Sequence, residues 1–428
     1  MRREDVPPLL EQAAGQLPQA DMADAAWAGG FAIRRRRRRS TAIALAALLV
    51  IVAVAALAAA FGGGKVTPTP LPTPPSVPPS TPAGFILPQG KIAGIDFWVA
   101  PPVGSERYLN RVDTPLGDSL RVPERPADLQ VEPITEIAAV LLARLRDGRY
   151  RPLLLDRDGH WAVAAVALAP IRTGPPLSAG AVSPDGRFVA FPQPGELLLL
   201  DGATAGVRIV TLPSQDLSAI SWLPDGQRVL VSGTGAAYSV LAGPGRPGEP
   251  NVTALVGGDD PSALTAPYRL EGSVGRVSLM QYNVASGWTL QGQLPLPATS
   301  WIGQAFTAGS RVARLFLAPK LPQVVTVASR PQVVAAISTE PSLPSRLLVL
   351  AETPAATPPP WQRSAVPAEV RTPGCCSVLG WYDEHTLLVR AVGKQSGWIV
   401  AWDLQTAEVR RVAELKADSV ALGPGIHG

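Results

Sequence analysis

Two adjacent cysteines, Cys375 and Cys376, are the residues whose types and spacing most directly suggest chemistry in this chain. In an oxidising compartment such neighbours can close into a vicinal disulfide, and two buried or free thiols are the alternative. The Cys-x-x-Cys spacing of redox-active pairs is missing, which argues against redox catalysis. The pair is therefore a candidate vicinal disulfide with a structural role.

Other residues that could act chemically do not form a site in the sequence. The three histidines, His160, His385 and His427, show no metal-ligand spacing with one another or with the cysteines. A Gly-x-Ser-x-Gly nucleophile elbow is absent. The aspartates of two Pro-Asp-Gly turns, Asp185 and Asp225, stand where a side chain caps its own turn. We predict no catalytic residue, no metal site and no cofactor.

The elements that position these residues are short apolar runs separated by turn dipeptides. Asp-Gly dipeptides separate the runs at 137–144, 150–155 and 161–168. Asp-Gly between apolar runs is a strong hairpin signal, because both residues tolerate a positive φ. These three runs are predicted to be strands of one meander.

The same pattern recurs at a fixed period. Residues 180–191 read Gly-Ala-Val-Ser-Pro-Asp-Gly-Arg-Phe-Val-Ala-Phe, and residues 220–231 read Ile-Ser-Trp-Leu-Pro-Asp-Gly-Gln-Arg-Val-Leu-Val. A period near 40 residues with about four strands per unit is typical of a β-propeller blade. Dividing residues 85–428 by about 40 to 45 predicts an all-β propeller of six to eight four-stranded blades, preceded by one transmembrane α-helix.

These repeats resemble those of TolB-type and WD40-like bacterial β-propellers, in which a small residue or Trp precedes Pro-Asp-Gly and a strand. Two copies match well, whereas residues 251–352 depart from the pattern. The arrangement also resembles membrane-anchored propeller proteins of high-GC Gram-positive bacteria, and arginine outnumbers lysine 33 to 5, as expected for a GC-rich genome. The resemblance implies the fold, and propellers host many unrelated activities.

A membrane anchor is predicted at residues 40–62. Residues 40–61 contain no charged side chain, and at about 1.5 Å per residue they span a hydrocarbon core of about 30 Å. A cleaved signal peptide is the alternative, and the long preceding segment argues against it. By the positive-inside rule the N-terminus is cytoplasmic. Six consecutive arginines precede the helix and are expected to contact anionic lipid headgroups: Arg34, Arg35, Arg36, Arg37, Arg38 and Arg39.

The charge of the chain is concentrated before the anchor. Residues 1–39 hold 8 Lys and Arg against 5 Asp and Glu, whereas the remainder holds 30 against 29. A nearly neutral outer domain lacks the basic stripe that neutralises phosphates. We therefore predict no nucleic-acid partner.

Four segments follow from these features. Residues 1–39 are a short basic cytoplasmic tail, residues 40–62 the helix, residues 63–84 a Pro-rich spacer and residues 85–428 an extracytoplasmic β-propeller domain. Eight prolines within 67–82 favour an extended polyproline II spacer of about 3.1 Å per residue. The chain is thus expected in the cell membrane, with its C-terminal domain outside.

Two functions are compatible with this organisation. The first is a non-enzymatic binding, sensing or scaffolding module for an extracytoplasmic protein, peptide or glycan. The alternative is an extracytoplasmic enzyme with a channel active site, glycan-active or quinoprotein-like. An enzyme should gather several titratable side chains at one mouth of the channel, whereas a binding module is expected to carry an aromatic or apolar patch.

Overall fold

The structure is a computed structural model, and it describes residues 84–243, 249–255, 268–273, 276–283, 287–296, 300–318, 332–340, 343–350, 375–393 and 397–427. Within these ranges the helical segments are two 3-10 turns, η1 (Glu106–Tyr108) and η2 (Pro424–His427). No helix in this part of the chain is long and apolar enough to cross a membrane. The predicted anchor and the run Arg34–Arg39 lie outside the described residues.

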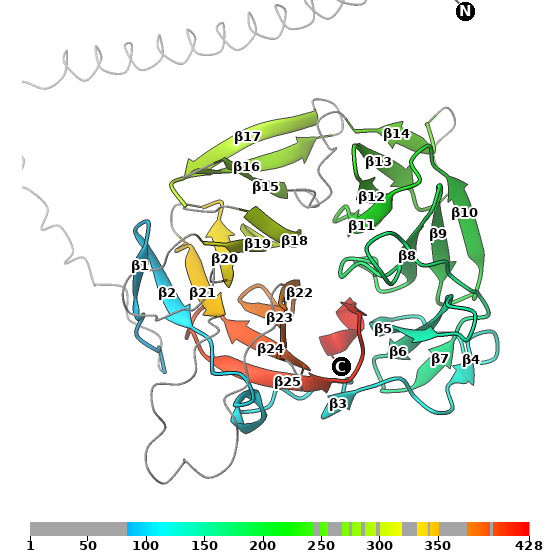
Figure 1. Cartoon of the computed structure of the whole chain (residues 1–428), viewed down its shortest axis with the longest axis horizontal. Helices are drawn as coiled ribbons and strands as arrows, with labels where there is room; N and C mark the ends of the chain where they lie inside the picture. Colours follow the sequence, from blue (N-terminus) through cyan, green and yellow to red (C-terminus); the bar gives the residue numbers. More distant parts are fainter. Residues whose placement is uncertain are drawn as a thin grey trace, which may run out of the picture. The chain divides into compact units, whose positions relative to one another are not determined.

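Six sheets form a ring, which is the arrangement of a six-bladed β-propeller (Figure 1). We number the blades along the chain and give each blade's strands in spatial order. Blade 1 consists of β26 (Val420–Leu422), β5 (Ile137–Arg144), β6 (Tyr150–Asp156), β7 (Trp161–Val163) and β4 (Ala127–Asp128). Blade 2 consists of β8 (Phe188–Gln193), β9 (Glu196–Asp201) and β10 (Val207–Thr211). Blade 3 consists of β11 (Leu217–Trp222), β12 (Arg228–Gly233), β13 (Ala236–Leu241) and β14 (Val252–Ala254).

The remaining blades follow in the second half of the chain. Blade 4 consists of β15 (Tyr268–Ser273), β16 (Arg276–Asn283) and β17 (Gly287–Leu294). Blade 5 consists of β18 (Ser300–Ala308), β19 (Arg311–Leu317), β20 (Gln332–Ser338), β21 (Arg346–Leu350), β2 (Ile95–Val99) and β1 (Gly90–Ile92). Blade 6 consists of β22 (Ser377–Trp381), β23 (Thr386–Val392), β24 (Gly397–Asp403), β25 (Val409–Leu415) and β3 (Ser119–Leu120).

The predicted meander is confirmed as β5, β6 and β7. The Asp147 carboxylate accepts the backbone N–H of Arg149 at 3.0 Å, and Gly148 takes a φ of +85°. These are the turn roles that favour Asp-Gly. The third strand is shorter than expected, since it ends at Val163; beyond it, Ala164 donates to the Pro152 carbonyl and Leu168 pairs with Tyr150.

The ring is closed by the C-terminus. Strand β26 pairs with β5, with Val420 opposite Leu141, so the last strand of the chain is the innermost strand of blade 1. Inner strands of neighbouring blades are in contact, for example β22 with both β18 and β26. Strands from both ends of the domain thus pair within blade 1, and this pairing holds the ring closed.

Residues 90–128, which we call the belt, run along the outside of the blades on both sides of this closure. Its strands pair in parallel with the outer strands of three successive blades: β2 with β21, β3 with β25 and β4 with β7. The sheets have three to six strands, so the predicted four strands per blade are exceeded where the belt is added. The belt accounts for the additional strands of blades 5, 6 and 1.

The apolar core is divided among the contacts between blades. Blades 5 and 6 share a cluster that contains Trp98, Trp398 and Trp402, so these tryptophans pack between blades. The cluster between blades 3 and 4 is the smallest in the described part of the chain. It contains Leu223, Leu230, Ala237 and Leu255.

Candidate functional site

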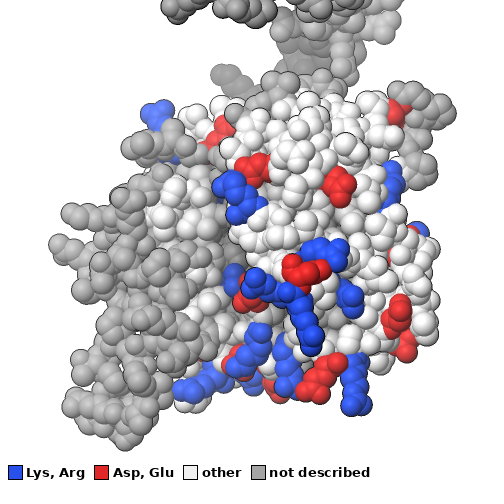
Figure 2. Space-filling view, turned by 45° about the vertical axis from the view of Figure 1, so that its right-hand side comes forward, with Lys and Arg blue, Asp and Glu red and all other residues white. Residues whose placement is uncertain are grey.

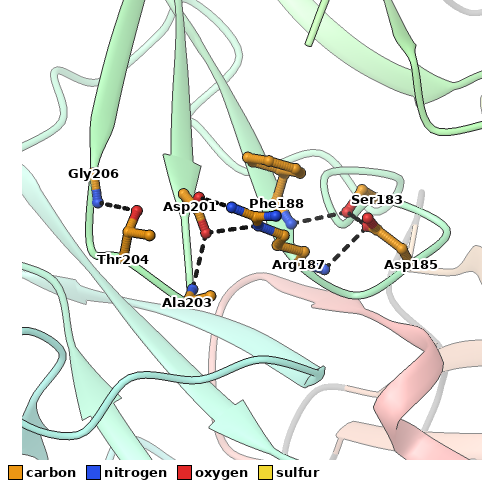
Figure 3. Close-up of polar contacts among 8 residues, drawn as sticks. All are labelled: Ser183, Asp185, Arg187, Phe188, Asp201, Ala203, Thr204 and Gly206. Atoms are coloured by element: carbon orange, nitrogen blue, oxygen red, sulfur yellow. Dashed lines mark hydrogen bonds and ion pairs between the residues drawn. The ribbon is translucent and has the colours of Figure 1, made fainter. Parts of the chain in front are cut away.

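The aspartates of the Pro-Asp-Gly turns have structural roles, as predicted. In blade 2, Asp185 Oδ1 accepts the Ser183 hydroxyl at 2.5 Å and the backbone N–H of Arg187 at 3.1 Å (Figure 3). In blade 3, Asp225 Oδ1 accepts the N–H of Gln227 at 3.0 Å. Each carboxylate caps its own turn.

The residue after the blade 2 turn forms an ion pair. The Arg187 Nη2 lies 2.6 Å from Asp201 Oδ2, and Asp201 Oδ1 also accepts the backbone N–H of Ala203 at 2.9 Å (Figure 3). Burial acts to raise the pKa of Asp201, but the hydrogen bonds from Arg187 and Ala203 outweigh it and hold the pKa below its ordinary value. This ion pair therefore links the start of β8 to the end of β9 in blade 2.

Two of the histidines lie in separate contacts with charged side chains. His385 Nδ1 lies 2.9 Å from Arg311 Nη1, across the boundary between blades 5 and 6. His160 Nδ1 lies 3.2 Å from Asp156 Oδ2. Potential ligand atoms of Asp156, Asp158 and His160 lie within 4.8 Å of one another, a cluster that sequence analysis missed because it compared histidines only with one another and with cysteines. Asp156 Oδ1 accepts the backbone N–H groups of Asp158 and His160, so this carboxylate shapes the turn.

Cys375 and Cys376 are joined by a disulfide immediately before β22. The two residues are 5% and 2% exposed and pack with Trp98 and Trp402 in the core between blades 5 and 6. Gln332 Nε2 lies 3.7 Å from Cys375 Sγ. Because the sulfur atoms are enclosed, the disulfide contributes to a blade interface.

The centre of the ring contains two cavities that share lining residues, and we call the two together the channel. The inner segments of blades 1, 2, 3, 5 and 6 run along it in the same direction. The starts of these segments line a cavity of about 460 Å³, which we call the strand-start mouth. Their ends line a cavity of about 350 Å³, which we call the strand-end mouth. Ala179, Gln304 and Leu379 line both cavities and mark the waist between them.

Gln304 joins three blades at this waist. Gly303, with a φ of +63°, lies in the irregular part of β18, where the register shifts between Ile302 and Phe306. Gln304 Oε1 accepts the Ser178 hydroxyl at 2.5 Å, and Gln304 Nε2 donates to Ser221 Oγ at 3.4 Å. Sequence analysis did not identify Gln304, although a glycine inside an apolar strand is a signal of a bulge.

The strand-end mouth combines apolar surface with uncharged polar side chains such as Ser183 and Ser221. Trp222 Nε1 donates to the carbonyl of Ala181 and Trp381 Nε1 to that of Phe306, both at 3.0 Å, so the protein satisfies both indole N–H groups. His427 is the one titratable side chain among the described lining residues, and its ring lies 4.7 Å from that of Tyr382. The apolar lining includes three aromatic rings and three prolines: Trp222, Phe306, Trp381, Pro184, Pro224 and Pro424.

The strand-start mouth differs in carrying two charged side chains. Arg390 and Asp418 are its charged lining residues in the described part of the chain, and Arg390 Nη2 donates to the backbone carbonyl of Asp418 at 3.0 Å. Burial lowers the pKa of Arg390, with Asp418 acting in the opposite direction. Five lining side chains carry hydroxyl groups: Thr173, Ser178, Ser218, Ser377 and Ser419.

Charges elsewhere on the domain are mixed. On the face shown in Figure 2, basic and acidic side chains lie next to one another, and most of them gather over its lower half. Such mixing is typical of a soluble surface. The absence of a nucleic-acid partner and the binding of anionic lipid by Arg34–Arg39 remain predictions.

Comparisons with known proteins find similar solved structures and no family. No family model matches the chain, and no curated protein matches it. Among solved structures, TolB from Acinetobacter baumannii is similar, with a TM-score of 0.38 and 14% identity over 67% of this chain and 65% of TolB. The chain thus spans a little less than two thirds of that relative. The Kuenenia stuttgartiensis hydrazine synthase gives a TM-score of 0.38 and 15% identity over 66% of this chain and 80% of that one.

TolB is a β-propeller, as the sequence resemblance predicted, and this chain is a six-bladed one. The propeller assignment rests on the six sheets and their closure by β26, because similarities at these TM-scores carry no argument of their own. What these relatives bind or catalyse does not transfer to this chain.

Proposed function

We propose that this protein is a membrane-anchored, extracytoplasmic β-propeller that acts as a non-enzymatic binding module, with the strand-end mouth as its ligand site. The ligand class that fits is an uncharged, partly apolar peptide segment of a protein partner. One observation carries the proposal: aromatic rings and prolines line the strand-end mouth, with His427 as the one titratable side chain among the described lining residues.

The chemistry of the lining favours binding over catalysis. General acid and base catalysis needs at least one positioned titratable group with a shifted pKa, and usually a partner for it. The indole N–H groups of Trp222 and Trp381 are bound to backbone carbonyls. What these residues offer a ligand is therefore apolar ring surface, and aromatic residues of this kind dominate the binding energy of protein interfaces.

The cavity has a size suited to a short peptide segment or a few side chains. Its volume of about 350 Å³ is at the lower end of the range of about 300 to 1,000 Å³ for ligand pockets. Pro184 and Pro224 are exposed at its rim. A peptide partner can thus insert an apolar side chain while its backbone lies over the prolines.

The sequence supports placing this mouth outside the cell. The uncharged segment 40–61 follows six arginines, and the proline-rich spacer then separates the domain from the bilayer. A domain that is held away from the bilayer suits a partner other than lipid.

Affinity capture tests the proposal. The full chain in detergent is immobilised and exposed to the extracytoplasmic fraction of the source cells, and retained proteins are identified. Trp381→Ala and Pro224→Asp are expected to reduce retention of the specific partner about tenfold or more. Ile209→Ala is the control, because Ile209 is 56% exposed on the outer strand β10 and lines neither mouth.

Thermal unfolding of each variant separates lost binding from lost folding. Pro224 is exposed, so its substitution is expected to leave the midpoint nearly unchanged even where Trp381→Ala lowers it. If both mouth variants retain the same proteins as the wild type and the Ile209 control, the strand-end mouth is not the binding site.

A further inference from the structure

We propose that the strand-start mouth is a second binding site, and that it takes a small hydroxylated carboxylate of the sugar-acid class. This inference is independent of the proposed function, which uses the opposite end of the channel. Ala179, Gln304 and Leu379 at the waist separate the two mouths.

Arg390 supplies the cationic group of the site. Its Nη2 donates to the Asp418 carbonyl, whereas its Nε is buried and has no hydrogen-bond partner in the described part of the chain. Arg390 is half-buried, and a guanidinium whose described hydrogen-bond partner is a neutral carbonyl group is incompletely compensated. An anionic ligand group would supply that compensation, and guanidinium groups bind carboxylates with favourable geometry.

The hydroxyl groups of the lining define the rest of the ligand. Ser218, Ser377 and Ser419 come from three different blades, and each hydroxyl can both donate and accept. A ligand with several hydroxyl groups can exchange hydrogen bonds with such a ring of side chains. An aliphatic or aromatic acid cannot, so hydroxylated acids are favoured over plain ones.

Asp418 makes the cavity selective. Asp418 is exposed and lines the cavity, and its backbone carbonyl accepts a hydrogen bond from Arg390. An acid with a single carboxylate places its charge at Arg390, and its hydroxyl groups can donate hydrogen bonds to the Asp418 carboxylate. A second ligand carboxylate near Asp418 would be repelled.

The volume fits one such molecule. The cavity measures about 460 Å³, within the range of about 300 to 1,000 Å³ for small-molecule sites. The strand-end mouth, lined by rings and prolines, has no comparable cation among its described residues. The two ends of one channel are therefore suited to different ligand classes.

Isothermal titration calorimetry on the full chain in detergent tests this site, with glucuronate, glucose and acetate as probes. Glucuronate is expected to bind at least about tenfold more tightly than either other probe, because charge-assisted hydrogen bonds and hydroxyl contacts are combined only in glucuronate. Arg390→Gln is expected to weaken glucuronate binding about tenfold or more. Ser419→Ala, which removes one hydroxyl without removing charge, is expected to weaken it about two- to tenfold.

Matched controls make the result decisive. Arg149→Gln removes an arginine that pairs with Asp147 in the β5–β6 turn and lines neither mouth, so glucuronate binding should be unchanged. Trp381→Ala should also leave it unchanged, which separates this site from the strand-end mouth. The proposal is overturned by equal binding of glucose or acetate, by equal losses in Arg149→Gln and Arg390→Gln, or by no glucuronate binding at about 10 mM. If Arg390→Gln does not fold, the effect of Ser419→Ala on glucuronate binding decides whether the proposal holds.

Discussion

Gly180 and Gln304 show how single residues determine the shape of the channel. A Cβ atom added at Gly180 would lie 2.1 Å from Gln304 Nε2 and 2.6 Å from the carbonyl oxygen of Ile220. The second contact is with backbone, which cannot move aside as a side chain can. The waist therefore requires a glycine beside the glutamine.

Gly180→Ala is expected to destabilise the domain by about 1 to 3 kcal/mol, the cost of overpacking a closely packed site. Denaturant unfolding measures the loss. Gly292→Ala is the control, since a Cβ at Gly292 meets nothing within 4 Å. Equal stability of the two variants would contradict the description of the waist.

Asp201 predicts a pH dependence. Its pKa is lower in the folded protein than in the unfolded chain, so its stabilising effect is present above the unfolded value of about 3.9 and is lost as the pH falls through the folded value. Asp201→Asn should thus lower the unfolding midpoint at pH 7, and the difference from wild type should disappear once the pH is below the folded value. A difference that persists at that pH would show that the carboxylate charge is not its cause.

At the residue scale, the sequence predicted interactions between residues that are close in the chain and missed contacts between residues that are far apart in it. The turn-capping roles of Asp185 and Asp225 depend on residues within the same turn, so Pro-Asp-Gly was sufficient to predict them. The contact of Gln304 with Ser178 joins residues 126 apart in the chain. No local pattern encodes such a pair.

Arg314 links two structural elements. This arginine of β19 is fully buried, and it donates to the carbonyls of Gly303 at 2.9 Å and Leu270 at 2.9 Å. Leu270 belongs to β15, so the side chain connects blade 5 to blade 4. Its guanidinium also lies 5.3 Å from the centre of the Trp301 ring.

Arg314→Met is expected to cost about 2 to 3 kcal/mol, because two buried carbonyl groups lose charge-assisted hydrogen bonds. Denaturant unfolding measures this cost, with Arg149→Met in an exposed turn as the control. A loss no larger than that of the control would mean that Arg314 does not hold the two blades together.

Blade 4 is predicted to open before the other blades. Its described apolar contact with blade 3 is the smallest between blades, and β17 is mostly exposed or half-buried. Regions with little buried apolar surface have low local stability. Hydrogen exchange should therefore be at least about tenfold faster in β16 than in β5. Equal rates would indicate that the ring opens only as a whole.

The sequence predicted the central strands of the blades better than the strands at their inner and outer edges. Strands β5 to β7 and the turns of blades 2 and 3 follow from dipeptides and apolar runs. Strand β26 has three residues and β3 has two, too few for a periodic pattern, and their partners are distant in the chain. The closure and the belt therefore became visible only with the structure.

At the scale of the whole molecule, the domain is a ring closed twice, by β26 on the inside and by the belt on the outside. The sequence predicts an anchor before this ring, and the proposed function requires the ring to lie outside the cell. Cys375 and Cys376 are buried and joined to one another, so a newly introduced cysteine can be labelled without interference from them.

Cysteine labelling of intact cells tests this central claim most directly. Ser76→Cys places a thiol in the predicted spacer, and Ala13→Cys places one in the predicted cytoplasmic tail. With a membrane-impermeant maleimide, the cysteine at position 76 should be labelled in intact cells, and the cysteine at position 13 only after permeabilisation. Protection of position 76 until the cells are permeabilised would contradict the account.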